Sequence, residues 1–348
     1  MRPEIDFNQR PYLVIWEITR ACVLVCRHCR AASQPNAHPQ QLTTEEGFRF
    51  IDQVQRAQPM IFVLTGGDPT QRADHKELIK YAAGKGLRVA FSPSATPRLL
   101  DTDFNELKAL GVQRMSISLD GASRETHNAF RGVKRSWDWT MEVLKRAREA
   151  DLPIQLNTTF TRVNVAEFEQ FAKLLRDEIK PSAWTIFLLV PTGRGKAGDL
   201  LTAQELEELF GKMYDFSKTV PFPVQTTEGQ SYRRYVLERT PKDAPRPHGT
   251  LGVNDGKGFV FVSHVGEICP SGFLPYVAGN VRTDELIDVY RNSPVFRELR
   301  DSSLLKGKCG RCEYREICGG SRARAYALTG DHMAEEPFCA YEPKQQRS

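Results

Sequence analysis

The stretch Tyr12-Leu13-Val14-Ile15-Trp16-Glu17-Ile18-Thr19-Arg20-Ala21-Cys22-Val23-Leu24-Val25-Cys26-Arg27-His28-Cys29 decides how this 348-residue chain is interpreted. Its first five residues are apolar and largely branched, which predicts a buried strand over 12–17. The following loop carries Cys22, Cys26 and Cys29 with the spacing CxxxCxxC. A [4Fe–4S] cluster usually takes four cysteine ligands, so a loop with three leaves one iron open to chemistry. The stretch therefore predicts a strand that ends in a cluster-binding loop.

Other uses of these cysteines fit less well. A chain of 348 residues buries an ample core without disulfides, and its start, Met1-Arg2-Pro3-Glu4-Ile5-Asp6, does not resemble a signal peptide. Eight cysteines then favour a reducing cytoplasm. Zinc needs a closed tetrahedral shell, and His28 lies inside the second spacer, too close to its neighbours to complete one easily. Zinc stays open as the alternative to a cluster.

Composition excludes several other classes. Hydrophobic residues make up 40% and charged residues 26%, as in ordinary globular proteins. No apolar run approaches the length of about 18 residues that a membrane span needs. The net charge of +5, from 48 basic and 43 acidic residues, is no nucleic-acid signature, although it would help to attract an acidic substrate or electron carrier. We therefore expect neither nucleic acid nor membrane as a partner.

Short apolar runs alternate with longer amphipathic stretches up to about residue 190. The runs predict strands over 12–17, 60–65, 87–92, 113–119, 153–159 and 183–190. The stretches between them predict helices over 43–57, 73–84, 103–110, 136–150 and 164–178. Such alternation is typical of a parallel sheet with right-handed crossovers. Six such units predict an α/β fold, a partial (β/α)6 TIM-like barrel with one side open.

Polar motifs follow the predicted strands at the positions where parallel barrels carry functional groups. The cysteine loop follows the first strand, and the others are Thr65-Gly66-Gly67-Asp68-Pro69, Ser92-Pro93-Ser94-Ala95-Thr96-Pro97, Ser116-Ile117-Ser118-Leu119-Asp120-Gly121, Asn157-Thr158-Thr159 and Pro191-Thr192-Gly193-Arg194-Gly195. We expect all six to face one rim.

The cluster loop, its open iron and the preceding strand resemble the radical S-adenosylmethionine (radical SAM) enzymes. The resemblance implies that SAM chelates the open iron and is cleaved reductively to a 5′-deoxyadenosyl radical. An external one-electron donor of flavodoxin or ferredoxin type would supply the electron. His28 would pack over the cluster or the adenine, or would be a loop residue with an exposed ring.

The resemblance also implies a set of SAM contacts. Gly66, Gly67 and Asp68 stand where the family usually has Gly-Gly-Glu, whose backbone carbonyls accept hydrogen bonds from the SAM ammonium. Asp68 departs from that pattern, which leaves its side chain without a secure role. The remaining candidates for the SAM carboxylate, ribose or substrate are Ser118, Asp120, Arg131, Asn157 and Arg194. For the last two, the alternatives are a turn asparagine and a solvated charge.

Beyond the barrel the chain predicts a connecting segment and a smaller domain. We expect the barrel over 10–198, a connecting helix (202–218) and a Pro- and Gly-rich lid or linker (240–258) within 199–254, and an auxiliary domain over 255–348. This last part contains an apolar hairpin pattern, 259–269, which turns at Val265-Gly266. A further helix is expected over 283–291.

The auxiliary domain carries a second cysteine set, Cys309, Cys312, Cys318 and Cys339, with the spacing CxxCx5Cx20C. Four thiolates close the shell of a second [4Fe–4S] cluster, and a zinc site has the same ligand count. The pattern resembles the C-terminal SPASM (twitch-like) extension of radical SAM enzymes, which implies the cluster. Cys269 is left over, either as a lone thiol near the substrate or as a buried apolar residue.

The strand-one motif and the second cysteine spacing look most like the branch of the family that acts in heme biosynthesis. This resemblance implies hydrogen abstraction from a tetrapyrrole and oxidative decarboxylation of propionates, as on iron-coproporphyrin III. Basic residues would suit such a substrate, for instance Arg98, Arg194, Arg233, Arg234, Arg322 and Arg324. The alternatives are a maturase that modifies a ribosomally made peptide and a non-catalytic iron–sulfur electron carrier.

Overall fold

One continuous sheet organises the protein. In the computed structural model, which describes residues 5–241, 243 and 252–344, ten strands form this sheet in the order β10-β9-β8-β1-β2-β3-β4-β5-β6-β7. Strands β1 to β8 run parallel, and β9 and β10 continue antiparallel beyond β8. Their bounds are β1 Leu13–Glu17, β2 Ile61–Thr65, β3 Val89–Phe91, β4 Val112–Ser118, β5 Ile154–Phe160, β6 Ala183–Leu188, β7 Val224–Thr227, β8 Phe259–Val262, β9 Glu267–Cys269 and β10 Gly279–Asn280.

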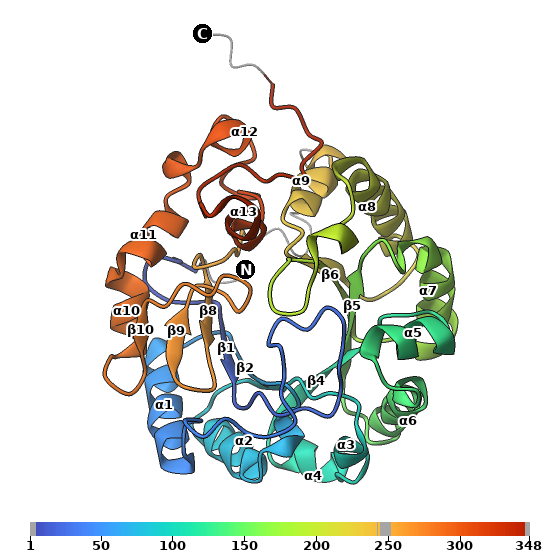
Figure 1. The fold of residues 1–348 in the computed structure, drawn as a ribbon, viewed down its shortest axis with the longest axis vertical. Coiled ribbons are helices and arrows are strands. Elements are labelled where there is room, and N and C mark those ends of the chain that lie inside the picture. The colour runs from blue at the N-terminus through green and yellow to red at the C-terminus, as the bar shows by residue number, and fades with distance from the viewer. Residues whose placement is uncertain (1–4, 242, 244–251, 345–348) are drawn as a thin grey trace.

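The helices surround the curled sheet, as Figure 1 shows. Those that connect or follow β1 to β7 are α1 Thr44–Ala57, α2 His75–Gly84, α3 Pro97–Leu100, α4 Phe104–Ala109, α5 Arg124–Arg131, α6 Ser136–Glu149, α7 Phe168–Leu174 with a π-helical turn over Leu175–Ile179, α8 Ala203–Ser217 and α9 Ser231–Glu238. The C-terminal helices are α10 Leu286–Asn292, α11 Pro294–Arg300, α12 Gly307–Gly310 and α13 Arg322–Thr329. The predicted α/β partial barrel is confirmed.

Each of the six predicted strands agrees with an observed strand to within two residues at either end. The sheet nevertheless extends beyond them, because β7 adds next to β6 and β8 pairs in parallel with β1. The sequence of β7, Val-Gln-Thr-Thr, is too short and polar to stand out as a buried strand. Helices α5 and α13 were likewise not predicted, because each spans only eight residues, too few for a clear helical periodicity.

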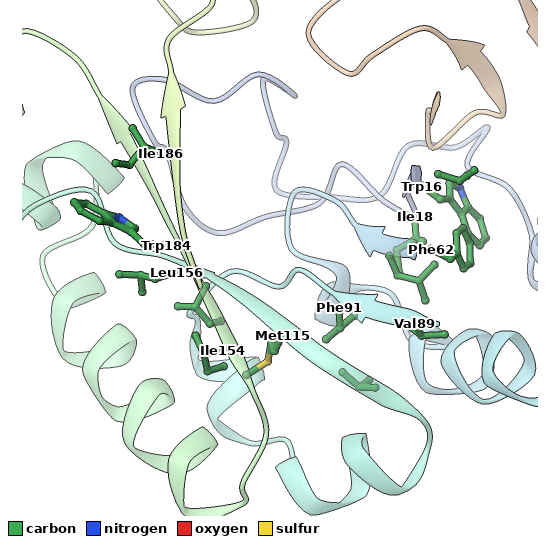
Figure 2. Packing of buried hydrophobic residues seen from close by; sticks show 14 of the residues in the cluster. Trp16, Ile18, Phe62, Val89, Phe91, Met115, Ile154, Leu156, Trp184 and Ile186 are labelled. Carbon is green, nitrogen blue, oxygen red and sulfur yellow. The ribbon is translucent and has the colours of Figure 1, made fainter. Parts of the chain in front are cut away.

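The core lies between the sheet and the helices. Trp16 of β1 packs edge-on against Phe50 of α1, with ring centroids 5.2 Å apart. Figure 2 shows Trp16 near Phe62, and Trp184 with Ile186 farther along the sheet. Since side chains alternate along a strand, the residues between these core positions point to the inner face of the sheet.

That inner face is polar toward the carboxyl ends of the strands. On β4, Met115 and Ile117 join the core, so Ser116 and Ser118 point inward. Ser118 lies opposite Asn157 of β5 in the parallel register. Because strands β1 to β6 run in one direction, the polar motifs that follow them share one edge, as the sequence predicted.

The C-terminal segment shares the barrel's sheet. The hairpin predicted over 259–269 is present as β8 and β9, and Val262 of β8 pairs with Trp16 of β1. The domain boundaries at 198/199 and 254/255 stay predictions. Of the lid or linker expected over 240–258, residues 242 and 244–251 lie outside the described residues.

Within the described ranges, every helix is too short or too polar to cross a membrane.

Candidate active site

The loop after β1 gathers the three N-terminal cysteines. Cys22 and Cys26 are buried around Leu24, and Cys29 packs against them. A backbone bond from the Cys22 amide to the Gln34 carbonyl (2.8 Å) closes the base of the loop. The CxxxCxxC spacing thus brings the thiols together, as the sequence predicted.

The spacing of the thiols bears on which group they suit. In the described part of the chain, no three His, Cys, Asp or Glu side chains converge closely enough to hold a single metal ion. A tetrahedral zinc site needs that convergence, whereas the cysteines of a cubane cluster bind separate irons. Burial raises the pKa of Cys22 to about 11, so this thiol stays protonated unless a bound cationic group stabilises its thiolate.

The two glycines after β2 let this loop lie directly against the next one. A Cβ on Gly67 would stand 2.6 Å from the carbonyl oxygens of both Arg20 and Ala21, and one on Gly66 would stand 2.7 Å from that of Thr19. The Gly67 amide donates to the Thr19 carbonyl at 2.8 Å. The glycines therefore set the position of the chain just before Cys22.

Asp68 has a structural side chain. It is fully buried and accepts hydrogen bonds from the Thr70 amide (3.1 Å), the Thr70 hydroxyl (2.8 Å) and the Thr96 hydroxyl (2.7 Å). These donors come from the loops after β2 and β3, so the carboxylate joins two rim loops. Its side chain is fully used there, which leaves the backbone for any contact with a ligand.

Sequence reasoning missed Ser94, although it lies in a quoted motif. Its hydroxyl donates to the Gly67 carbonyl at 2.9 Å and lies 3.8 Å from the Cys22 sulfur. The Pro-flanked serines after β3 were the available signal, but only the fold shows which loop they contact.

Asp120, Arg131 and His28 form a buried polar group beside the cysteines. An Asp120 carboxylate oxygen lies 3.2 Å from Arg131 Nη1 and 3.9 Å from His28 Nε2. Burial alone would lower the pKa of Arg131, but the charges of Cys26 and Asp120 outweigh it and raise the pKa. Burial lowers the pKa of His28 to about 4, and its ring packs on Phe130 with centroids 4.6 Å apart. The alternative of an exposed His28 ring is therefore wrong.

This group holds several unpaired polar atoms. Arg131 Nε and His28 Nδ1 are sealed from solvent and have no hydrogen-bond partner among the described residues, and Asp120 Oδ2 keeps its ion pair with Arg131 but accepts no hydrogen bond there. Each such atom costs about 1–3 kcal/mol. A ligand with both acidic and hydroxyl groups would satisfy them, and SAM carries a carboxylate and ribose hydroxyls. The residues present therefore fit SAM.

The other candidates take different places. Ser118 and Asn157 lie side by side on the inner face, where Asn157 Oδ1 accepts from Gln155 Nε2 at 2.9 Å. Arg194 braces the cysteine loop, because its Nε donates to the Cys26 carbonyl and its amide to the Cys29 carbonyl, at 2.9 and 3.0 Å. Its contact with cofactor or substrate stays a prediction.

The second cysteine set shows backbone amides that point at sulfur. The Glu336 amide lies 3.3 Å from Cys309 Sγ, and the Gly320 amide lies 3.4 Å from Cys318 Sγ. Burial raises the pKa of Cys318 to about 12 and that of Cys339 to about 11. Amide donors stabilise sulfur that carries negative charge, as in a thiolate bound to a cluster.

Four of the arginines proposed for a propionate substrate are engaged internally. Arg324 pairs with Glu336 at 2.8 Å and Arg234 with Glu238 at 2.9 Å. Arg322 donates to the Ala334 carbonyl (2.6 Å) and Arg233 to the Ile317 carbonyl (3.0 Å). They hold the C-terminal segment together, so the suggestion that these four face the substrate is wrong.

Fold and site together define a partial α/β barrel that carries a three-cysteine loop at its carboxyl rim. The chain belongs to the radical SAM superfamily, whose sequence pattern matches residues 16–175. It is thus a radical SAM enzyme, and membership implies one [4Fe–4S] cluster and SAM as cofactors.

The relatives within this superfamily match the chain over nearly its whole length. An AdoMet-dependent heme synthase of Nitratidesulfovibrio vulgaris is 41% identical, over 96% of this chain and 93% of the relative. Another of Methanosarcina barkeri is 40% identical, over 97% and 99% respectively. The structure of Streptococcus suis SuiB bound to its precursor peptide SuiA matches with a TM-score of 0.73 at 16% identity, over 96% of this chain and 76% of SuiB, which supports the fold alone.

Proposed function

We propose that this radical SAM enzyme acts in heme formation, on an iron tetrapyrrole whose propionates it decarboxylates oxidatively to vinyl groups. The observation that carries the proposal is the similarity of 41% over 96% of the chain to a protein named AdoMet-dependent heme synthase. A match of that extent reaches well beyond residues 16–175, which the superfamily pattern covers. Iron-coproporphyrin III is the substrate we expect.

In this proposal Cys22, Cys26 and Cys29 hold the cluster that binds SAM. When bound, the cluster and SAM together supply a carbon radical that abstracts hydrogen. The role of the protein is to hold SAM in one orientation and to keep water out. Arg131 suits the SAM carboxylate, because its buried guanidinium has an unpaired Nε.

The neighbours of Arg131 keep it in place for that role. Asp120 binds the Arg131 guanidinium through one carboxylate oxygen, and its other oxygen accepts the Thr159 amide at 2.7 Å. Ser94 and the Gly67 backbone lie beside Cys22, where the SAM ammonium would bind. Ser118 and Asn157 complete the set of proposed contacts from the inner face.

The four C-terminal cysteines would hold a second [4Fe–4S] cluster. Removal of one hydrogen atom and one CO2 from a propionate leaves one electron to be taken up when the vinyl group forms. A second cluster would supply an acceptor for that electron. The amides that point at Cys309 and Cys318 support a cluster in this position.

An acidic flavodoxin- or ferredoxin-type carrier of the cytoplasm would reduce the first cluster. Val23 and Val25 are 51% and 58% exposed on the cysteine loop itself, which is unusual for apolar residues. The exposed Lys134 and Arg135 follow Gly132, where an added Cβ would stand 2.6 Å from Val25 Cγ2 and 2.9 Å from the Val25 carbonyl oxygen. An apolar patch with basic neighbours suits an acidic protein that docks close to the cluster.

The test is anaerobic incubation of reconstituted protein with iron-coproporphyrin III, SAM and dithionite, followed by mass spectrometry. We expect a product that has lost two propionate carboxyl groups, together with 5′-deoxyadenosine. Cys22→Ser should form neither product, while Cys269→Ser is the matched control that keeps activity. Deoxyadenosine without porphyrin turnover would contradict the substrate and leave a peptide as the alternative.

The same reconstitution tests the second cluster. Cys309→Ser combined with Cys312→Ser should lower the iron content by about half and abolish decarboxylation. It should leave the formation of deoxyadenosine in place. Unchanged iron content would contradict the second cluster.

A further inference from the structure

A buried ionic group joins the ends of β1 and β8 at the rim that carries the cysteine loop. The Glu17 carboxylate lies 2.6 Å from Arg30 Nη2 through one oxygen and 2.9 Å from His264 Nδ1 through the other. Glu17 and His264 are almost fully buried, at 2% and 5% exposed. Arg30 directly follows Cys29, so this group adjoins the cluster loop.

The group faces the inner side of the barrel. Val14 and Trp16 of β1 join the helix-facing core, so alternation places Glu17 on the opposite, inner face. The same alternation on β8 turns Phe261 inward, and the Arg30 guanidinium lies over this ring at 4.5 Å. Cys269 of β9 lies opposite Phe261. The inward-facing residues of the neighbouring strands β1, β8 and β9 therefore form one wall of the barrel interior, and Arg30 joins this wall to the cysteine loop.

The charges of the group fix which nitrogen of His264 carries a proton. Burial alone would raise the pKa of Glu17, but Arg30 and the His264 hydrogen bond outweigh it and lower the pKa. The carboxylate is thus ionised and accepts Nδ1–H from His264, and Arg30 already balances its charge. A neutral imidazole that donates through Nδ1 carries a lone pair on Nε2. The described residues make a hydrogen bond to Nδ1 of His264 and none to its Nε2.

A histidine whose Nδ1–H binds a carboxylate and whose Nε2 is free has the arrangement of a metal ligand. Metal-binding histidines almost always donate their other N–H to a carboxylate or carbonyl, which orients the ring and makes it more basic. Iron in a porphyrin takes imidazole as an axial ligand. We propose that His264 Nε2 binds the iron of the tetrapyrrole substrate as an axial ligand and that Glu17 orients the ring.

This inference rests on the proposed function, since it needs an iron tetrapyrrole as substrate. The inference adds selectivity for the porphyrin that contains iron, because only that porphyrin can form a bond to His264. Recognition of the propionate carboxylates alone would not distinguish it from the metal-free porphyrin. Binding to His264 also fixes the macrocycle plane perpendicular to the iron–nitrogen bond, while contacts at the edge of the macrocycle must set its rotation about that bond.

Two other side chains could compete for the iron. Burial raises the pKa of Cys269 to about 12, so it stays a thiol, which is a weak ligand. The His38 ring lies 5.2 Å from that of His264, but its Nδ1 accepts the Gln40 amide at 3.2 Å. The proton of His38 then sits on Nε2, which cannot bind a metal in that tautomer. Of the three, His264 is the one whose imidazole lone pair accepts no hydrogen bond from the described residues.

The test compares two porphyrins in cluster-loaded protein with the clusters oxidised. Dissociation constants are measured for iron-coproporphyrin III and for metal-free coproporphyrin III. His264→Ala should weaken binding of the iron porphyrin by about tenfold or more and leave the metal-free porphyrin within twofold. His264→Gln keeps a donor to Glu17 without a ligand nitrogen and should show the same selective loss. His38→Ala is the matched control and should bind both porphyrins as wild type does.

Electron paramagnetic resonance of the ferric porphyrin gives the second readout. Protein labelled with [15N]histidine should show 15N hyperfine coupling to the iron in wild type, lost in His264→Gln, and added imidazole should restore a nitrogen ligand in His264→Ala. If wild type decarboxylates the substrate and His264→Gln keeps both the 15N coupling and the affinity for the iron porphyrin, the ligand assignment is overturned and the proposed function stands. Wild type that binds neither porphyrin overturns the proposed function as well.

Discussion

Replacement of Gly67 by alanine should damage the SAM-binding site far more than the fold. The new Cβ would stand 2.6 Å from two backbone carbonyl oxygens, those of Arg20 and Ala21, where ordinary contact begins at 3.4 Å. The chain next to Cys22 must therefore move by about 0.8 Å, the difference between these two distances. Backbone atoms cannot turn away as a side chain can.

The magnitude follows from that displacement. Overpacking of this kind costs about 1–3 kcal/mol of stability. A shift of about 1 Å at a reacting centre costs about 100-fold in rate. We expect Gly67→Ala to remain folded, to bind SAM poorly and to form 5′-deoxyadenosine about 100-fold more slowly.

The assay combines anaerobic reconstitution, electron paramagnetic resonance of the reduced protein with and without SAM, and the rate of deoxyadenosine formation. Gly84→Ala is the matched control, because it ends α2 and has nothing within 4 Å of the new Cβ. It should be neutral or stabilise the apoprotein by less than about 1 kcal/mol. A Gly67→Ala protein with a normal SAM-induced spectral change and a rate within twofold of wild type would refute the reasoning.

Three further results are expected. Arg131→Met should weaken SAM binding by about 10- to 100-fold in equilibrium dialysis, because a charged hydrogen bond contributes about 1.5–3 kcal/mol; an unchanged affinity would contradict its role. Trp184→Ala should lower the free energy of unfolding in urea by about 3–5 kcal/mol, since this fully buried ring contacts Phe168 and Phe216, and a loss below 1 kcal/mol would contradict the packing. Burial and the Asp255 charge raise the pKa of Glu228 well above 4.5, so its stabilising neutral form is lost as the pH rises above that value. The melting temperature of Glu228→Gln relative to that of wild type should therefore rise between pH 5 and pH 8. A difference in melting temperature that stays constant over this range would count against a raised pKa of Glu228.

The sequence was sufficient for the barrel strands and for the grouping of the cysteines, because both depend on local pattern. Apolar runs such as Leu13–Glu17 mark buried strands wherever they occur, and a spacing of two or three residues brings thiols together in any loop. The polar strand β7 lacks such a pattern. It is a strand only because β6 is available to pair with it.

The roles of single charged residues depended on partners far away in the chain. Asp68 binds Thr96, 28 residues away, and Arg324 binds Glu336, 12 residues away. The sequence shows that a charge is present but not what neutralises it. That is why Asp68 was left without a side-chain role, and why internal arginines looked available to a substrate.

The cysteine loop contains little regular structure, so its shape must come from what surrounds it. The loop after β2 holds residues 19–21, where the Gly67 amide binds the Thr19 carbonyl and the Asp68 amide binds the Ala21 carbonyl. The Arg27 amide donates to the Phe130 carbonyl in α5, and Arg194, after β6, donates to the Cys26 carbonyl. Three separate rim segments thus fix successive parts of one loop.

Because the cysteine loop is held by segments from different parts of the barrel, the similarity to other radical SAM enzymes extends beyond the loop itself. A loop held from three sides can keep three thiols in place only if β2, β4, β6 and the segments that follow them keep their register, since a shift in any of them moves one part of the loop against the others. Changes at the rim should therefore appear first as altered spectra of the cluster and weaker SAM binding, before any loss of thermal stability.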